Sequence, residues 1–227
     1  MEPTTQRSPN RRIAVIGTGY VGLPTGACLC SLGHHVTCCD ADRDKLAELR
    51  RGEVRIREPG LGELVRAGIS AGRLGFTRSS VSAVRDADAV FLCLPTPMAA
   101  DGGADLAAVA EVVREVRGHL PANGLLVTKS TVPVGTAARL AELVGRGDVA
   151  VVSNPEFLRE GRAVQDFLAP DRIVVGAAAD AAAQRVAELY AGVDAPVVRT
   201  DPATAEVVKY RSEEHTSELQ SLRHFVC

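Results

Sequence analysis

The 227-residue sequence has no tryptophan, and aromatic residues of all kinds make up only 4% of it. Surfaces that stack nucleic-acid bases need aromatic side chains, and polyanion-binding proteins carry strong positive charge, whereas the net charge here is −2. No apolar run comes near the roughly 20 residues that a membrane-spanning helix needs. We therefore expect neither a nucleic-acid partner nor a membrane partner.

Cysteine is present, but without the spacing of a zinc site or of a disulfide framework. Five of the six cysteines fall within predicted strands or helices, among apolar neighbours. Free, buried thiols in a reducing cytoplasm are therefore the better interpretation, and we expect no metal site. Residues 1–10 are polar and carry two prolines, which predicts a frayed tail and not a signal peptide. These features predict a cytoplasmic protein.

The sequence does contain an alternation of apolar runs and helical segments over about two hundred residues. Runs such as IAVIG, AVFLCL and RIVVGA are continuously apolar, as is typical of strands covered on both faces. Strand, helix and strand at this spacing predict parallel pairing through right-handed crossovers. We predict one α/β domain over residues 11–202, a Rossmann-type doubly wound, mostly parallel sheet with helices on both faces. The predicted strands are Arg12–Gly17, His35–Asp40, Leu74–Thr77, Ala89–Leu94, Leu125–Lys129, Val149–Ser153, Arg172–Gly176 and Pro196–Thr200, and the predicted helices are Val21–Leu32, Arg43–Arg51, Gly60–Ala71, Leu106–His119, Thr136–Val144 and Ala179–Ala191.

A glycine-rich turn, Gly17-Thr18-Gly19-Tyr20-Val21-Gly22, follows the first predicted strand and opens the first predicted helix. In a dinucleotide site the first glycine permits the tight turn, the second lets a pyrophosphate approach the backbone, and the third allows close helix–strand packing. The helix N-terminus then presents free N–H groups to the phosphates. The motif alone is weak, but its place between strand and helix predicts a dinucleotide site.

An acidic residue, Asp40, ends the second predicted strand 23 residues after Gly17, close to the spacing of about 20 expected for the acid that binds the adenosine ribose. A carboxylate there accepts hydrogen bonds from ribose hydroxyls and repels a 2′-phosphate, so NAD is favoured over NADP. An ordinary strand-end acid is the alternative. For Lys45 two interpretations stay open, a contact on the adenosine side of the cofactor or a solvated helix lysine.

Two further predicted strands end in hydroxyl-bearing residues. In Leu94-Pro95-Thr96-Pro97 the prolines stop the strand and should leave the Thr96 hydroxyl exposed, and Lys129-Ser130-Thr131-Val132-Pro133 leads into a helix. Ligands of open α/β sheets lie beyond the carboxyl ends of the strands, so together the two segments predict a cofactor-facing rim. Turn formation or helix capping is the alternative for each segment taken alone.

A third segment, Asn154-Pro155-Glu156-Phe157-Leu158-Arg159-Glu160-Gly161, follows another predicted buried strand. Glu156 and Glu160 are spaced i and i+4, so they would lie on one face if the segment is helical. Acids clustered in a pocket can have separated pKa values and share acid–base work. A solvated helix with its acids on the wet side is the alternative.

Taken together, these motifs resemble the UDP-glucose 6-dehydrogenase family, which includes GDP-mannose and UDP-N-acetylmannosamine dehydrogenases. The resemblance covers about residues 11–210 and rests on GTGYVG, CLPTPM with DGGADL, STVPVGT, NPEFLREG, DFLAPDRIVVG and TAEVVKY, in that order. The PDR element is most similar to the UDP-glucose branch. The resemblance implies oxidation of a sugar C6 alcohol to a carboxylate by two successive hydride transfers to NAD, with the intermediate aldehyde captured by a cysteine.

The resemblance also implies roles for individual residues. Thr131 and Glu156 match positions that handle a water near the reacting carbon, and Lys209 matches the lysine that stabilises oxyanion charge at the sugar C6. Phe157 and Leu158 match backbone contacts to the sugar nucleotide. The implied catalytic residues are Thr131, Glu156, Glu160 and Lys209, and the implied substrate-binding residues are Glu156, Phe157, Leu158 and Lys209. The implied cofactor-binding residues are Gly17, Gly19, Tyr20, Val21, Gly22, Asp40, Lys45, Thr96, Thr131 and Glu160.

The sequence departs from the family pattern after Tyr210. Residues 211–221 read RSEEHTSELQS, which matches the in-frame translation of a common sequencing-adapter oligonucleotide. We expect residues 203–210 to begin a central helix, residues 211–227 to be non-native, and the native protein to continue beyond Tyr210. A genuine polar helix is the alternative.

Two features that the family resemblance implies fall in or beyond this stretch. The asparagine four residues after the lysine is replaced by Glu213, and the nucleophilic cysteine belongs to a later glycine-rich motif that Cys227 does not match. The 227-residue chain alone should therefore bind NAD weakly and not oxidise UDP-glucose. The full-length form should use a nucleotide sugar and be a homo-oligomer assembled through the central helix.

Three functions stay open at this point. The first is NAD-dependent oxidation of UDP-glucose to UDP-glucuronate, a precursor for polysaccharide synthesis. The second is the same reaction on GDP-mannose or UDP-N-acetylmannosamine. The third is a non-catalytic NAD-binding module, and the joint presence of the four implied catalytic residues argues against it, since a sensor needs only the nucleotide turn.

Overall fold

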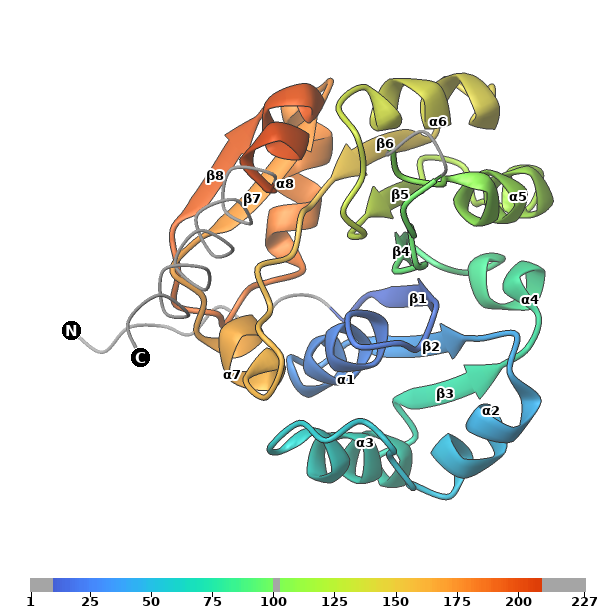
Figure 1. Ribbon diagram of the computed structural model, residues 1–227, viewed down its shortest axis with the longest axis vertical. Coiled ribbons are helices and arrows are strands. Elements are labelled where there is room, and N and C mark those ends of the chain that lie inside the picture. Colours follow the sequence, from blue (N-terminus) through green and yellow to red (C-terminus); the bar gives the residue numbers. More distant parts are fainter. Residues whose placement is uncertain (1–9, 100–102, 210–227) are drawn as a thin grey trace, which may run out of the picture.

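An eight-stranded sheet runs through the computed structural model, which describes residues 10–99 and 103–209. The strand order is β3-β2-β1-β4-β5-β6-β7-β8, with helices on both faces (Figure 1). This confirms the predicted doubly wound α/β fold, whereas the predicted tail at 211–227 lies outside the described residues. The strands are β1 (Arg12–Ile16), β2 (His35–Cys39), β3 (Leu74–Thr77), β4 (Ala89–Leu92), β5 (Leu125–Thr128), β6 (Ala150–Ser153), β7 (Ile173–Ala177) and β8 (Val197–Thr200).

All six predicted helices are present, with ends shifted by at most three residues. Two further helices, α4 and α7, escape the sequence analysis because five or six residues are too few to show a hydrophobic period. Residues 202–209 are also helical, and no helix within the described ranges is long and apolar enough to cross a membrane. The helices are α1 (Gly22–Ser31), α2 (Arg43–Arg50), α3 (Leu61–Ser70), α4 (Ser80–Val84), α5 (Ala107–Val116), α6 (Thr136–Val144), α7 (Ala163–Leu168) and α8 (Asp180–Glu188).

Two apolar cores, one on each face of the sheet, account for the continuously apolar strands. Along β1, Ile13 and Val15 belong to the core beneath α1, α2, α3, α7 and α8. Ala14 and Ile16 belong to the core beneath α4, α5 and α6. Successive side chains of one strand are thus buried on opposite faces, as expected for a strand covered on both sides.

The chain changes its direction of travel across the sheet between β1 and β4. Strands β1, β2 and β3 extend one side of the sheet, and the chain then returns to place β4 beside β1 and continues outward through β5 and β6. The loops after the strands diverge at such a switch point and leave a crevice, where ligands of open α/β sheets bind. The topology therefore places the glycine turn after β1 next to the loop after β4.

One strand pair departs from the expected parallel pairing. Strand β7 runs antiparallel to β6, with Val152 opposite Ala177, and β8 is again parallel to β7. A parallel crossover usually returns the chain along the sheet with a helix. The β6–β7 connection instead holds an extended segment and the six-residue α7, so the chain re-enters the sheet at the end where β6 left it. The predicted mostly parallel sheet is confirmed, with β6 and β7 as its antiparallel pair among the described strands.

Candidate functional site

The glycine turn contains two close backbone contacts that leave no room for a side chain. Gly17 follows β1 with a φ of 97°, and a Cβ there would overlap the carbonyl oxygen of Cys93, just past β4. A Cβ on Gly22, the first residue of α1, would overlap the carbonyl oxygen of Gly17. A Cβ on Gly19 would meet no described atom within 4 Å. Packing thus requires the outer two glycines, while the middle glycine faces open space.

The N-terminus of α1 is open to an anion. No side chain in the described part of the chain caps it by a hydrogen bond, and its first turn carries no acidic residue. The positive end of a helix dipole and free backbone N–H groups favour a phosphate at such a terminus. The turn between β1 and α1 therefore has the features of a pyrophosphate-binding site.

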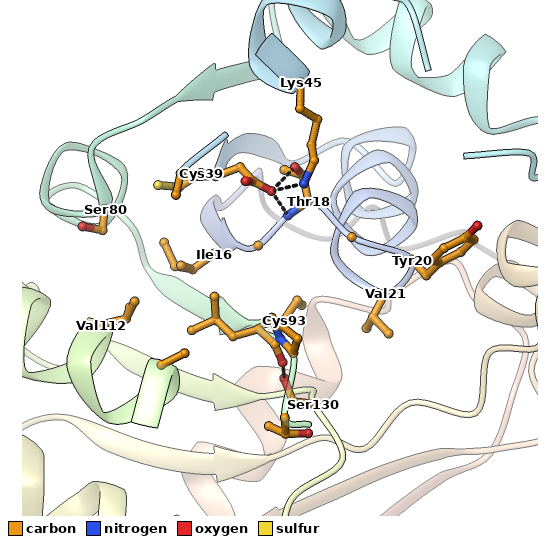
Figure 2. Close-up of a pocket in the computed structure, with 18 of the residues that line it drawn as sticks. Ile16, Thr18, Tyr20, Val21, Cys39, Lys45, Ser80, Cys93, Val112 and Ser130 are labelled. Atoms are coloured by element: carbon orange, nitrogen blue, oxygen red, sulfur yellow. Dashed lines mark hydrogen bonds and ion pairs between the residues drawn. The ribbon is translucent and has the colours of Figure 1, made fainter. Parts of the chain in front are cut away.

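Asp40 lies just past β2 and accepts hydrogen bonds beside the glycine turn from Thr18 and Lys45, the two partners labelled in Figure 2. Its Oδ2 accepts bonds from the N–H and the hydroxyl of Thr18, at 3.0 and 2.5 Å, and from Nζ of Lys45 at 2.8 Å. Its Oδ1 accepts the N–H of Asp42 at 3.0 Å. Burial raises the pKa of Asp40, but these donors, Lys45 foremost, outweigh burial and lower the pKa to about 2. Asp40 is thus a fixed, ionised acceptor, and Lys45 is its ion-pair partner.

A cavity of about 710 Å³ lies over this edge of the sheet. Its walls come from the ends of β1, β2, β4 and β5, around the switch point, and its volume is within the range of about 300–1,000 Å³ typical of ligand pockets. Gly22 does not line the cavity, because it packs against Gly17. The implied cofactor-binding residues that do line it are Gly17, Gly19, Tyr20, Val21, Asp40, Lys45, Thr96 and Thr131.

Thr96 and Thr131, from the two segments of the predicted rim, both line the cavity, and Thr96 is half-buried. The Thr96 hydroxyl also has a partner across the rim. It donates to the carbonyl oxygen of Thr131 at 2.7 Å. The hydroxyl of Ser130 donates to the carbonyl oxygen of Leu94 at 2.6 Å. These two bonds tie the loop after β4 to the loop after β5. Both loops line the cavity, so the bonds fix the spacing between two of its walls.

Glu156 lines the same cavity and forms a buried ion pair with Lys209. The distance from Nζ to Oε1 is 2.9 Å, and the two side chains are only 8% and 10% exposed. Glu156 Oε2 accepts the N–H of Leu158 at 2.6 Å, and the Lys209 ammonium lies 5.8 Å from the centre of the Phe157 ring. The pair joins the loop after β6 to the helical residues 202–209. A carboxylate on a cavity wall can handle protons, and an ammonium paired with it can stabilise an oxyanion.

The segment between β6 and α7 is not helical, so the two implied acids do not share a helix face. Pro155 has no N–H to give to a helix and disfavours helical backbone at Asn154. Glu156 is buried, whereas Glu160 is exposed and is not among the residues of the cavity wall. The condition for an i, i+4 acidic pair, a helical segment, is therefore not met, and Glu156 pairs with Lys209, 53 residues away. The cofactor role of Glu160 stays a prediction.

Residues 11–194 match the family model described as the UDP-glucose/GDP-mannose dehydrogenase family, NAD binding domain. The chain belongs to this family. UDP-glucose 6-dehydrogenase TuaD of Bacillus subtilis is 42% identical over 205 residues, which are 88% of this chain and 44% of that protein. UDP-glucose 6-dehydrogenase of Pseudomonas aeruginosa is 46% identical over 188 residues, which are 79% of this chain and 42% of that protein.

Solved structures of dehydrogenases from the same family superpose on this NAD-binding domain. A UDP-glucose dehydrogenase from Pyrobaculum islandicum gives a TM-score of 0.84 at 42% identity, over 91% of this chain and 50% of that chain. A ternary complex of GDP-mannose dehydrogenase from Pseudomonas aeruginosa gives a TM-score of 0.86 at 33% identity, over 92% of this chain and 50% of that chain. The chain spans about half the length of the relatives it matches. The family, the fold and the NAD cofactor predicted from the sequence are confirmed.

The five cysteines within the described residues of this dehydrogenase domain are free and buried. Burial raises the pKa of Cys28 and of Cys93 to about 12, and that of Cys39 to about 11. A thiol with such a pKa stays protonated near neutrality and is a poor nucleophile. The described cysteines are therefore packed in the apolar cores, as the sequence analysis expects.

Three buried polar groups close to the site are not found by the sequence analysis. Nζ of Lys129 lies 3.4 Å from Oδ1 of Asn154 and 3.3 Å from the hydroxyl of Tyr190, which donates to the same Oδ1 at 2.5 Å. The other two groups are the carboxylates of Glu58 and Glu206, which accept backbone N–H groups at the starts of α7 and α6. Lys129 and Glu206 stand in segments that the sequence analysis used, Lys129–Pro133 and TAEVVKY, but neither residue is assigned a role there.

Proposed function

We propose that the complete protein oxidises UDP-glucose to UDP-glucuronate with NAD, and that this chain supplies the cofactor site and part of the catalytic site. The observation that carries the proposal is the buried ion pair that Lys209 forms with Glu156, because Glu156 lines the same cavity as the glycine turn. A cofactor-binding module without chemistry needs no buried acid–base pair there, so the pair argues for a catalytic domain. Identities of 42% and 46% to UDP-glucose 6-dehydrogenases, against 33% to a GDP-mannose dehydrogenase, favour UDP-glucose as the substrate.

The residues of the cavity fit NAD. Backbone N–H groups at the N-terminus of α1, near Gly19, Tyr20 and Val21, suit the pyrophosphate oxygens. Asp40 suits the ribose hydroxyls as a hydrogen-bond acceptor, and its negative charge disfavours the 2′-phosphate of NADP. Lys45 contributes indirectly, by keeping the Asp40 carboxylate ionised and in place.

The catalytic assignments rest on the ion pair and its neighbours. NAD supplies the hydride acceptor when it is bound. Glu156 handles the proton of a nearby water, and Lys209 stabilises the negative charge that develops on the substrate oxygen. Thr131, on the wall of the same cavity, helps to hold that water, and the backbone of Phe157 and Leu158 contacts the sugar nucleotide.

We also propose that the 227-residue chain alone does not complete the oxidation, because every described cysteine is buried with a raised pKa. The complete protein is proposed to be a cytoplasmic homo-oligomer. Incubating the purified chain with NAD and UDP-glucose tests the first of these statements. Sustained NADH formation would overturn it.

The cofactor assignment is tested by calorimetric titration of the chain with NAD and with NADP. We expect NAD to bind at least about tenfold more tightly, because a carboxylate at Asp40 repels the 2′-phosphate. Asp40→Ala should remove most of that preference. Equal affinities for the two cofactors in the unsubstituted chain would contradict the assignment.

The substrate assignment is tested on the complete protein by following NADH formation with UDP-glucose, GDP-mannose and UDP-N-acetylmannosamine. We expect the highest kcat/KM with UDP-glucose. Glu156→Gln and Lys209→Met should each lower kcat by about a hundredfold or more, as expected for loss of acid–base or oxyanion catalysis. A higher kcat/KM with GDP-mannose would favour the second member of the family.

A further inference from the structure

Glu206 is a buried carboxylate that fixes the loop after β5. Its Oε2 accepts the N–H of Gly135 at 2.7 Å and its Oε1 accepts the N–H of Ala137 at 2.8 Å, at the start of α6. Oε1 also accepts the hydroxyl of Ser153, at the end of β6, at 3.3 Å. Glu206 stands on the helical residues 202–209. One side chain thus links α6, β6 and that helical segment.

Glu58 repeats this arrangement at the loop after β6. Its Oε1 accepts the N–H of Gly161 at 2.7 Å and its Oε2 accepts the N–H of Ala163 at 2.9 Å, at the start of α7. Like Gly135, Gly161 has a positive φ, 81° against 88°. In both places a buried carboxylate accepts one N–H from a left-handed glycine and a second from the residue two positions later. We call each of these arrangements a carboxylate clamp.

The clamps act on the two loops that carry the proposed catalytic groups. The Glu206 clamp binds the backbone directly after the loop of residues 130–134, which includes Thr131. The Glu58 clamp binds the backbone directly after residues 154–160, which include Glu156. Glu206 also lies three residues before Lys209 on the same helical segment. The Glu206 clamp therefore sets the place of Lys209 relative to both loops.

Two other helices of the domain begin with a local side-chain cap. Asp42 caps α2 and Ser79 caps α4, each with its side chain bonded to an N–H two or three residues away. In the clamps the carboxylate comes from 69 to 105 residues away. A local cap would satisfy the same N–H groups. The remote carboxylates in addition bind each loop to a distant element of the fold. A buried carboxylate is costly unless its oxygens are hydrogen-bonded, and both oxygens of each clamp are.

We propose that Glu58 and Glu206 are positioning residues, which hold the loops after β6 and β5 so that Glu156 and Thr131 face one cavity and Lys209 stays paired with Glu156. The catalytic roles of those three residues rest on the proposed function. The hydrogen bonds that hold their loops do not depend on it. It predicts that each clamp can be released separately. Release of either clamp should disturb the catalytic groups and leave the glycine turn, with Asp40, intact.

The first test is hydrogen–deuterium exchange on the 227-residue chain with Glu206→Gln and Glu58→Gln. A glutamine keeps the shape but turns an NH₂ group toward one of the two N–H donors, so one charge-assisted bond is lost. We expect exchange at residues 131–137 and 203–209 to rise at least about tenfold in Glu206→Gln, with residues 157–163 unchanged. Glu58→Gln should show the opposite pattern.

Glu142→Gln is the matched control, because Glu142 is an exposed glutamate on α6 and its substitution makes the same change of charge. Its exchange pattern should equal that of the unsubstituted chain. If a glutamine variant does not fold, the aspartate variant, Glu206→Asp or Glu58→Asp, keeps the charge but shortens the reach. Exchange that rises evenly in both loops, or in neither, would overturn separate clamping.

The second test measures kinetics of the same variants in the complete enzyme. We expect kcat to fall at least about tenfold and the KM for NAD to change by a smaller factor, because the glycine turn and Asp40 are not disturbed. Unchanged kcat in variants with loop-selective exchange would overturn the positioning role. If the unsubstituted enzyme failed to oxidise UDP-glucose, the proposed function would fail, whereas the exchange result would still decide whether the clamps exist.

Discussion

The two parts of the site differ in how far apart in the sequence their contacts lie. The cofactor part, formed by the glycine turn with Asp40 and Lys45, joins residues 5 to 22 positions apart. The catalytic part, formed by the loops after β5 and β6 with residues 202–209, joins Lys209 to Glu156 across 53 positions. A strand, a helix and a second strand bring the glycine turn and Asp40 together, and the backbone after β4 packs against Gly17. The catalytic part needs the sheet assembled as far as β7.

This difference should be visible in stability. Contacts within one β-α-β unit survive partial opening of the remaining sheet, whereas contacts between distant elements are lost first. Substitutions in the cofactor part should therefore act on NAD binding, and substitutions in the catalytic part should act on stability and turnover. The largest expected effects come from the glycine turn.

Gly22→Ala should damage the cofactor part most. Its methyl group would overlap the carbonyl oxygen of Gly17, so α1 would have to move away from β1. We expect NAD affinity to fall by roughly a hundredfold or more and the free energy of unfolding to fall by about 3 kcal/mol. Calorimetric titration and urea unfolding measure the two effects.

Two other glycines provide controls for this substitution. Gly19→Ala meets no described atom within 4 Å, so it should leave stability unchanged and weaken only NAD binding. Gly75→Ala, on β3 and equally unobstructed, should leave NAD binding unchanged. A Gly22→Ala chain that bound NAD normally would show that the turn is not the cofactor site.

Lys209→Met should have the largest effect in the catalytic part. It leaves the buried Glu156 carboxylate without the ammonium that lies 2.9 Å away. Removing one member of a buried ion pair costs about 3–5 kcal/mol of unfolding free energy. Because the cofactor part is built locally, NAD affinity should stay within about twofold.

The double variant Glu156→Gln/Lys209→Met is the control for Lys209→Met. It removes both charges, so it should recover much of the stability lost in the single variant. Urea unfolding of the two single variants and the double variant gives the coupling energy directly. Strictly additive losses would mean that the two side chains do not interact in solution.

The local contacts of the cofactor part explain why the sequence predicts it so well. The turn Gly17–Gly22 and Asp40 are recognised by spacing within one β-α-β unit, and the structure places both on one cavity. Burial on both faces predicts the strands for the same reason, since alternation within a strand is a local pattern. Lys45 was ambiguous in the sequence only because its partner depends on how α2 turns back on β2.

The motifs identify residues of the catalytic part, but they do not predict which of those residues are in contact. Glu156 and Glu160 are close in sequence, and the sequence analysis paired them, but the non-helical loop separates a buried acid from an exposed one. The true partner, Lys209, and the clamp residues Glu58 and Glu206 come from distant elements. Their contacts follow from sheet order and from the antiparallel β7, which no local pattern predicts.

Asp40→Asn should have an intermediate effect, confined to the cofactor part. Loss of a charged acceptor weakens hydrogen bonding by about 1.5–3 kcal/mol, so NAD affinity should fall roughly tenfold to a hundredfold. Calorimetric titration near neutral pH measures it. Asp44→Asn, an exposed acid of α2 with the same change of charge, should leave affinity unchanged.

The lowered pKa of Asp40 also has a consequence for stability. A carboxylate whose folded pKa is about 2 adds stability that is fully present above its unfolded pKa, about 3.9, and is lost as the pH falls toward 2. Asp40→Asn should therefore flatten the acid limb of the stability curve between about pH 4 and pH 2. Parallel acid limbs in the two chains would contradict the assigned network.

The smallest expected effect concerns His34, which links the start of β2 to the end of α8. This buried imidazole lies at the start of β2, with Nδ1 accepting the N–H of Arg11 at 3.3 Å and Nε2 lying 2.9 Å from the carbonyl oxygen of Leu189 after α8. Burial lowers the pKa of His34, while the bond to Leu189 and nearby Asp88 oppose the shift. The neutral ring with its proton on Nε2 satisfies both contacts.

The unfolded chain therefore takes up a proton on His34 before the folded chain does. Stability should be at its full value above the unfolded pKa of about 6.5 and should decline below it, by at most about 1.4 kcal/mol per pH unit. Urea unfolding at about pH 7.5 and about pH 5.5 measures the decline, which His34→Gln should reduce and His119→Gln, at an exposed histidine, should not. Because His34 ties β2 to α8 and lies outside the glycine turn, NAD affinity should change less than stability over this range. An equal loss of NAD affinity and of stability would mean that the cofactor part depends on the rest of the sheet. That result would contradict the inference that the cofactor part is held by contacts close in sequence.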